Sequence, residues 1–262
     1  MHWVLQQDMT SEFGFAELVA TLERTGIPHS HHKVIPFVGE IVPDISPEGH
    51  VIVFGSYSMR RAAAARGWLP GAFDIGALTY RDHMAQWGAE MLNADSMFCR
   101  FDEVLARLPD GLDAFFIRPV VDSKFFAGMV INRANFEEWH HQVAALGEDD
   151  DANLRGSTEV MVCGEKDILR EYRLWIIDGE VVTASLYKRD GRVLYSSEVD
   201  EDILRYGRDR ASEWAPARAY VMDVALLPGD ERRIIETNTI NAAGFYAGDV
   251  PKLVAAFERM EF

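Results

Sequence analysis

Residues 219–238 read AYVMDVALLPGDERRIIETN, and the organisation of the chain is best worked out from this stretch. Two short apolar segments flank a Leu-Pro-Gly-Asp turn, which predicts an antiparallel pair of strands. Asp223 lies in the middle of the first strand, and Glu236 and Asn238 lie two apart on the second, so their side chains share a face. Oxygen-bearing side chains of this kind hold hard cations such as magnesium, often together with phosphate oxygens. A solvated hairpin face is the alternative interpretation.

The composition limits the class of protein. With 262 residues the chain can bury a full core and form two subdomains. The net charge of −16 disfavours sequence-independent binding to nucleic acid, because such a surface repels phosphates. The only cysteines, Cys99 and Cys163, lack metal-ligand spacing, which is typical of a reducing cytoplasm. The N-terminal residues do not read as a signal peptide, and no apolar run reaches the roughly 18–20 residues of a membrane span. We therefore expect a cytoplasmic protein without a membrane partner.

The first part of the chain predicts a small open α/β domain over residues 1–74. The expected elements are strands at 2–7, 34–37 and 51–54, a helix at 11–25 capped by Ser11, and a helix after Gly55. The segment 51–54 is an unbroken apolar run, which is typical of a buried parallel strand.

The remainder predicts a mixed α+β arrangement of hairpins and helices. The expected elements are a helix-rich region at 74–112, a hairpin at 114–131, a helix at 136–146 capped by Asn135, an acidic loop at 147–153, a strand at 159–164, a hairpin at 171–187, the 219–238 hairpin and a helix at 250–260. Asp178-Gly179 in the 171–187 hairpin is a strong two-residue turn signal.

Several cations lie near predicted turns. Arg118 and Lys124 flank the turn of the 114–131 hairpin, and Arg118 is held extended by the proline that follows it. Such fixed cations suit the phosphates of a nucleotide, although solvated surface charges are the alternative. Lys188 and Arg189 follow a predicted strand and read either as turn charges or as phosphate ligands.

Two further patterns bear on binding. Glu171 and Arg173 share one face of a strand, which also fits a simple cross-strand ion pair. Ser56 and Tyr57 follow a buried strand and open a helix, where free N–H groups attract an anionic substrate; a plain capping turn is the alternative. The histidines at 29, 31, 32, 140 and 141 have no third partner at metal-ligand spacing, so we expect them to be solvated.

The order of these pieces resembles an ATP-grasp domain, and in detail the bacterial and phage branch distinguished by two arginines and a lysine. The matching pieces are FIRPVVDSKFFAG (116–128), EYRLWII (171–177), SLYK (185–188), Asp223 and ETNTINAAGFY (236–246). The resemblance implies a pre-ATP-grasp-like α/β domain at 1–74 followed by a two-lobed ATP-grasp domain at 75–262, with lobes at about 75–158 and 159–262.

The resemblance also implies the roles of individual residues, with ATP between the two lobes. Adenine and the nucleotide would be bound by Arg118, Lys124, Val160, Val162, Cys163, Glu171 and Arg189. Arg173 and Lys188 would be catalytic. One or two magnesium ions would be held by Asp223, Glu236 and Asn238. A substrate would be recognised by Ser56, Tyr57 and Asn241.

The activity implied is that of an ATP-dependent carboxylate–amine ligase that acts through an acylphosphate and releases ADP. Its partners would be a small carboxylate and an amine, with a peptide as a further candidate. Charge stabilisation by cations and magnesium would suffice, without a protein nucleophile. Two alternatives stay open: a non-catalytic nucleotide-binding module, and a phosphotransferase or nucleotidyl-type ligase on the same fold. A P-loop enzyme is excluded, because the sequence has no Gly-x-x-x-x-Gly-Lys-Ser/Thr motif.

Overall fold

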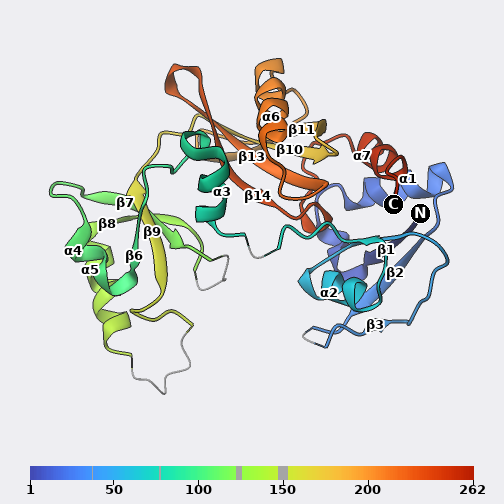
Figure 1. The fold of residues 1–262 in the computed structure, drawn as a ribbon, viewed down its shortest axis with the longest axis horizontal. Coiled ribbons are helices and arrows are strands. Elements are labelled where there is room, and N and C mark those ends of the chain that lie inside the picture. Colours follow the sequence, from blue (N-terminus) through green and yellow to red (C-terminus); the bar gives the residue numbers. More distant parts are fainter. Residues whose placement is uncertain (37, 77, 122–125, 147–152) are drawn as a thin grey trace. The chain divides into compact units, whose positions relative to one another are not determined.

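The computed structural model describes the chain except for residues 37, 77, 122–125 and 147–152 (Figure 1). The chain forms two compact units. Unit 1 joins Met1–Gly76 to Ile168–Phe262, and unit 2 is Ala77–Asp167. Each unit is described below by itself. The division into a domain at 1–74 and two lobes stays a prediction, because grouping by contacts is a different property from domain ancestry.

The first sheet of unit 1 has the strand order β3-β2-β1-β4-β5. Its strands are β1 (His2–Gln6), β2 (His29–Val34), β3 (Ile41–Val42), β4 (Val51–Phe54) and β5 (Pro70–Gly71). Strand β1 runs parallel to both β2 and β4. All four residues of β4 are buried, as expected for an inner parallel strand. Together with helices α1 (Phe15–Thr25) and α2 (Tyr57–Ala65), this sheet confirms the predicted open α/β fold.

Three details of this region differ from the sequence prediction. Helix α1 begins at Phe15, because Ser11 belongs to a preceding 3₁₀ turn, η1 (Gln7–Ser11). Gly14 caps the helix with φ 85°, and a Cβ at this position would lie 2.6 Å from Cβ of Phe245. The second strand is His29–Val34 rather than 34–37, because its polar residues hide the apolar alternation. His32 is buried rather than solvated, and its Nδ1 lies 2.7 Å from the carbonyl oxygen of Pro43.

The second sheet of unit 1 is antiparallel, with the order β12-β11-β10-β13-β14. Its strands are β10 (Arg170–Ile177), β11 (Glu180–Arg189), β12 (Arg192–Ser196), β13 (Ala219–Leu227) and β14 (Glu231–Asn238). Asp178 and Gly179 join β10 to β11 with φ 48° and 84°, which confirms the predicted tight turn. A 3₁₀ turn, η4 (Pro228–Asp230), joins β13 to β14. Lys188 and Arg189 lie inside β11, not after it.

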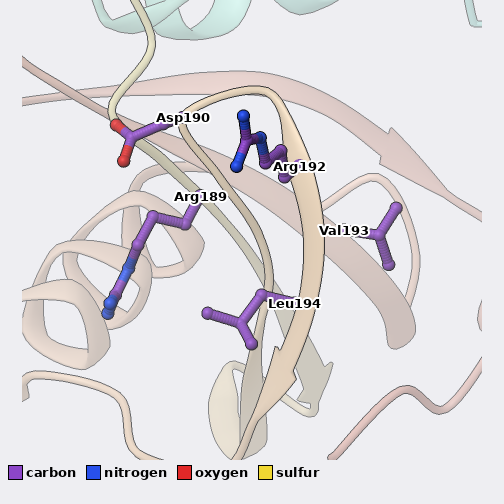
Figure 2. Close-up of a pocket in the computed structure, with 5 residues that line it drawn as sticks. All are labelled: Arg189, Asp190, Arg192, Val193 and Leu194. Atoms are coloured by element: carbon purple, nitrogen blue, oxygen red, sulfur yellow. The ribbon is translucent and has the colours of Figure 1, made fainter.

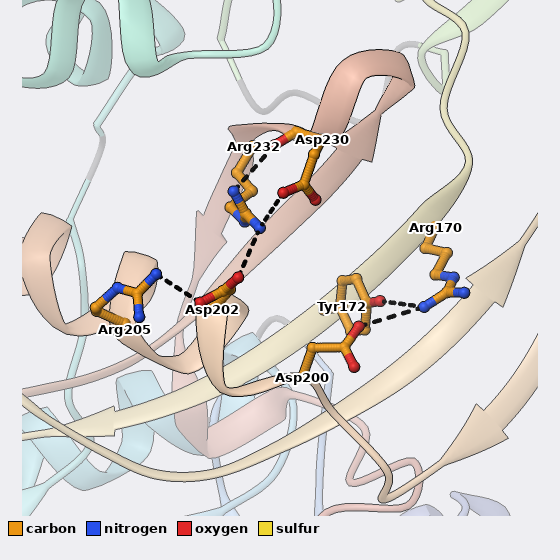
Figure 3. Close-up of polar contacts among 7 residues, drawn as sticks. All are labelled: Arg170, Tyr172, Asp200, Asp202, Arg205, Asp230 and Arg232. Atoms are coloured by element: carbon orange, nitrogen blue, oxygen red, sulfur yellow. Dashed lines mark hydrogen bonds and ion pairs between the residues drawn. The ribbon is translucent and has the colours of Figure 1, made fainter.

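Helix α6 (Glu201–Glu213), which was not among the predicted elements, covers one face of this sheet. Gly207 permits the close packing, because a Cβ there would lie 2.2 Å from Cδ2 of Leu174. Figure 3 shows the charged contacts at its first turn: Arg232 and Arg205 donate to the carboxylate of Asp202, at 3.3 and 2.5 Å. In the same view Arg170 lies 3.4 Å from Asp200, the residue that precedes the helix. These contacts fix α6 against the strands.

The opposite face of the second sheet packs on helix α7 (Val250–Glu258), which lies beside α1 (Figure 1). One apolar core therefore joins both sheets of unit 1. Its members include Trp3, Leu5, Phe15, Trp175, Val221, Phe245, Leu253 and Phe257. A 3₁₀ turn, η5 (Ile240–Ala242), leads from β14 towards α7. This core leaves the Arg170 end of β10 to polar residues.

Unit 2 contains a four-stranded antiparallel sheet with the order β6-β9-β7-β8. The strands are β6 (Met97–Arg100), β7 (Ala114–Pro119), β8 (Met129–Asn132) and β9 (Glu159–Gly164), and the helices are α3 (Tyr80–Trp87), η2 (Gly88–Glu90), η3 (Phe101–Glu103), α4 (Val104–Arg107) and α5 (Arg133–Ala144). The region 74–112 thus contains a strand as well as helices. Asn132, rather than Asn135, caps α5 by accepting a hydrogen bond from the N–H of Asn135. The acidic loop at 147–153 lies almost entirely outside the described residues.

Within the residues that the structure describes, no helix is both long and apolar enough to cross a membrane.

Candidate functional site

A row of charged side chains crosses three strands of the second sheet in unit 1. Arg173 on β10 lies opposite Asp223 on β13, and Asp223 lies opposite Glu236 on β14. Directly opposed residues of antiparallel strands share a face, so the three side chains are neighbours. Arg173 donates two hydrogen bonds to Asp223, from Nε to Oδ1 and from Nη2 to Oδ2, each 2.8 Å long. The structure thus brings a predicted catalytic arginine against a predicted metal ligand.

The ion pair between Arg173 and Asp223 is buried. Burial raises the pKa of Asp223, and the guanidinium of Arg173 opposes that rise. Burial acts to lower the pKa of Arg173, but the carboxylate of Asp223 outweighs it and raises this pKa. Each residue therefore depends on the other for its charged form, and the loss of either would leave an uncompensated buried charge.

Glu236 and Asn238 are in contact on β14, as their two-residue spacing predicts. The Nδ2 atom of Asn238 donates to Oε1 of Glu236 at 3.0 Å, and this directs the amide oxygen of Asn238 away from the bond. Oxygen atoms from Asp223, Glu236 and Asn238 form a donor set that fits magnesium. Within the described residues no group of three His, Cys, Asp or Glu side chains could hold a metal ion. A metal here would therefore use Asn238 and phosphate oxygens in addition to the two carboxylates.

Glu171 organises a second group of polar side chains. Its Oε1 lies 2.9 Å from Nζ of Lys188, and its Oε2 accepts a hydrogen bond of 2.8 Å from the hydroxyl of Tyr187. Glu171 is opposite Lys188 in the ladder between β10 and β11 and is two residues from Arg173, so it shares the face of the charged row. The carboxylate fixes the position of the Lys188 amine, which the sequence predicted to be catalytic.

Two tyrosines that the sequence did not single out surround Arg173. Its guanidinium carbon lies 4.8 Å from the ring centroid of Tyr246 and 5.8 Å from that of Tyr187. These distances allow cation–π attraction. Tyr187 could have been noticed because it is two residues from Ser185, the ladder partner of Arg173. Tyr246 gave no such signal, because its place depends on a loop conformation with φ 46°.

Arg189 lines an open pocket of about 530 Å³ at the turn between β11 and β12 (Figure 2). The other lining residues are Asp190, Arg192, Val193 and Leu194. Lys188, by contrast, contacts Glu171. The two adjacent cations that the sequence treated as alternatives therefore have different surroundings, and the structure associates only Lys188 with the charged row.

The residues predicted to recognise a substrate lie in the first sheet or beside it. The backbone N–H of Ser56 donates to Oε1 of Gln6 at 2.8 Å, and the exposed ring of Tyr57 lies 5.3 Å from the guanidinium carbon of Arg60. Asn241 is buried, and its Nδ2 donates to the carbonyl oxygen of Val53 at 2.7 Å. Its Oδ1 accepts from the N–H of residue 73 at 2.8 Å, so the amide holds backbone segments together. A role for these residues with a substrate stays a prediction.

The other nucleotide-binding candidates belong to unit 2. Arg118 is half-buried on β7 opposite Met161, and Lys124 lies outside the described residues. The backbone of Val160 and Val162 pairs with a strand on each side, β6 and β7. Cys163 is paired only with β7 among the described strands, so a backbone contact to adenine is best placed there. Burial raises the pKa of its thiol.

Solved structures with the same fold are ATP-grasp proteins. A RimK-domain ATP-grasp protein from Sphaerobacter thermophilus aligns with a TM-score of 0.65 at 14% identity, over 98% of this chain and 99% of that chain. D-cycloserine synthetase DcsG gives 0.62 at 14% identity over 99% of both chains. D-alanine–D-alanine ligase from Bacillus anthracis gives 0.61 at 12% identity, over 98% of this chain and 92% of that chain. At these identities the likeness defines the ATP-grasp fold alone.

The family follows from the sequence itself. Residues 100–256 match a family model described as an ATP-grasp domain, the second family of its ATP-grasp clade. This match covers more than half of the chain, so the protein belongs to that ATP-grasp family. A comparison with curated proteins gave no significant match.

Proposed function

We propose that the protein is an ATP-dependent carboxylate–amine ligase that forms a C–N bond through an acylphosphate and releases ADP and phosphate. The observation that carries the proposal is the row formed by Arg173, Asp223 and Glu236, with Lys188 held beside it by Glu171. An ATP-grasp domain with oxygen ligands and fixed cations on one sheet face suits phosphoryl transfer, which needs positioning and charge stabilisation.

Each residue of the row has a role in this proposal. Arg173 and Lys188 stabilise the negative charge that develops on the transferred phosphoryl group and the acylphosphate. Asp223, Glu236 and Asn238 would hold one or two magnesium ions, which when bound neutralise phosphate charge. Glu171 orients Lys188. Further nucleotide contacts come from Arg118, Lys124, Arg189 and the strand that contains Cys163, as the family resemblance implies.

The substrates are proposed by class. D-alanine–D-alanine ligase acts on amino acids by its name, and the ATP-grasp ligase PsnB was solved with a precursor peptide. These proteins support amino acids and peptides as candidates for the carboxylate and the amine. The free, buried thiols of Cys99 and Cys163 agree with our inference of a reducing cytoplasm.

A product assay tests the proposal. The purified protein is incubated with ATP, magnesium, hydroxylamine and pools of amino acids and small carboxylates. We expect ADP and phosphate together with an acyl hydroxamate, because hydroxylamine traps an activated acyl group. Stoichiometric AMP and pyrophosphate would contradict the acylphosphate. Binding of ATP without any turnover in every pool would identify a non-catalytic nucleotide-binding module instead.

A variant at Glu236 tests the metal assignment separately. Glu236→Gln keeps the size of the side chain but removes its charge, so turnover should fall at least about a hundredfold. Binding of ATP in the absence of magnesium should survive. Turnover by this variant at the wild-type rate in limiting magnesium would show that Glu236 is not a ligand. Glu198→Gln is the matched control, since Glu198 is an exposed carboxylate that follows the edge strand β12.

A further inference from the structure

An exposed aromatic surface lies next to the charged row of unit 1. Phe13 is 56% exposed and Tyr195 is 39% exposed, and their ring centroids are 5.0 Å apart. The ring of Tyr195 stacks on that of Tyr246 at 5.0 Å with an interplanar angle of 19°. We call these three rings, with Glu12, the aromatic surface. Large aromatic side chains gathered at the surface are typical of binding sites.

The aromatic surface is continuous with the proposed catalytic group. The ring of Tyr246 is the one over which the guanidinium of Arg173 lies, at 4.8 Å. The backbone of Tyr246 is held in the left-handed region, with φ 46°, which is unfavourable for a bulky residue. The next residue fixes this conformation, because the N–H of Ala247 donates to Oγ of Ser185 at 3.1 Å. Strain of this kind persists where the surrounding structure imposes it, and such residues gather at functional sites.

A carboxylate completes the aromatic surface. A Cβ placed on Gly244 would lie 3.5 Å from Cε1 of Tyr246 and 3.8 Å from Oε2 of Glu12, so ring and carboxylate border the same space. Among the described residues nothing forms a hydrogen bond or an ion pair with the side chain of Glu12. Burial raises the pKa of Tyr246, and Glu12 adds to that rise, so the phenol is neutral at physiological pH.

This combination identifies the charge of the ligand. Aromatic faces attract cations through their quadrupole, and the carboxylate of Glu12 adds a charged acceptor. The net charge of −16 also favours the approach of a cation. A metal ion fits poorly, because the rings supply no oxygen ligands beyond two phenols. An organic ammonium group satisfies the rings and the carboxylate together.

We propose that the aromatic surface binds an ammonium group of the amine substrate. This inference rests on the proposed ligase function, because it names the substrate class of that reaction. The nitrogen that attacks an acylphosphate must be neutral, so the bound charge belongs to a second group of the same molecule. The substrate is therefore a diamine or a basic amino acid, either free or at the end of a peptide.

A titration without ATP tests the cation site directly. The probes are choline and 3,3-dimethyl-1-butanol, which have the same shape but differ in charge, and binding is followed by saturation-transfer NMR. We expect choline to bind at least about tenfold more tightly than the neutral alcohol. Tyr195→Leu, Phe13→Leu and Glu12→Gln should each weaken choline about three- to tenfold. Tyr195→Phe, which keeps the ring, and Glu198→Gln, which removes a charge elsewhere, should leave its affinity unchanged.

The outcomes separate this site from the ligase activity. Equal binding of the two probes, or unchanged choline affinity in a folded Phe13→Leu/Tyr195→Leu variant, would overturn the cation site. Choline binding without ATP turnover in the product assay would keep the site and reject the ligase. If both hold, 1,5-diaminopentane should have a KM at least about fivefold lower than 1-aminopentane, and Tyr195→Leu should remove that difference without changing the KM for ATP. Equal KM values for the two amines would reject the ammonium group as the element recognised.

Discussion

Two ion pairs on the same strands, β10 and β13, have nearly the same geometry and opposite surroundings. Arg173 meets Asp223 through two hydrogen bonds of 2.8 Å, and Arg218 meets Asp178 through bonds of 2.7 and 2.8 Å. The side chains of the first pair are 10% and 3% exposed, and those of the second are 48% and 46% exposed. Hydrogen-bond geometry therefore does not distinguish the two pairs. Desolvation does, and it makes the inner pair costly to break and suited to chemistry.

The largest expected effect comes from breaking the inner pair. Arg173→Leu leaves the carboxylate of Asp223 buried without a partner, which should lower the free energy of unfolding by about 3–5 kcal/mol. Urea denaturation followed by circular dichroism measures the loss. The double variant Arg173→Met/Asp223→Leu removes both charges and should regain most of that stability while remaining inactive. A fully stable Arg173→Leu single variant would show that the pair is not desolvated as described.

The contrast between the pairs also separates what a sequence can predict from what it cannot. Glu236 and Asn238 were placed on one face because strand periodicity is local, and their hydrogen bond agrees. The contact between Arg173 and Asp223 was not predicted, because cross-strand neighbours depend on strand order and register. Fifty residues separate the two in the chain.

Two elements were missed for a related reason, which is that their apolar signal is weak. Helix α6 buries only Ile203, Gly207 and Ala211, so small residues replace the usual apolar stripe. Strand β12 is an edge strand and is mostly exposed, so neither face carries a buried pattern. The aromatic surface could not be predicted either, because it joins residues 12–13 to residues 195 and 246 through the fold.

The opposite face of β10 offers the second comparison, because packing without charge holds it. Gly207→Ala would place a methyl group 2.2 Å from the present position of Cδ2 of Leu174. Overpacking of this kind should cost about 1–3 kcal/mol, which is less than breaking the buried pair. Thermal unfolding measures it, with Ala211→Gly as a control for helix propensity at a neighbouring buried site. A stabilised Gly207→Ala variant would show that the helix can move away from the sheet.

The third comparison uses pH. Burial, with a contribution from Asp223, raises the pKa of Tyr187 above its ordinary value of 10.0. The folded state keeps this proton while the unfolded state loses it, so the stabilisation is complete below pH 10 and decreases as the pH rises further. The expected decrease is about 1.4 kcal/mol per pH unit. Unfolding free energies at pH 9–11 measure this slope, which should become smaller by one proton in Tyr187→Phe. An unchanged slope would mean that Tyr187 ionises normally in the folded protein.

The smallest effect is expected at the outer pair, and it is the most direct test of the comparison. Arg218 and Asp178 are about half exposed, so water already solvates both charges and replaces the hydrogen bonds when one partner is removed. Arg218→Leu should therefore cost only about 0.2–1 kcal/mol, and 1 M salt should reduce the cost further because it screens exposed charges. The measurement is urea denaturation at low and high salt, alongside Arg173→Leu, whose cost should change little with salt. Equal losses in the two variants would mean that bidentate geometry, rather than burial, sets the energy of these pairs, and the functional interpretation of the inner pair would lose its physical basis.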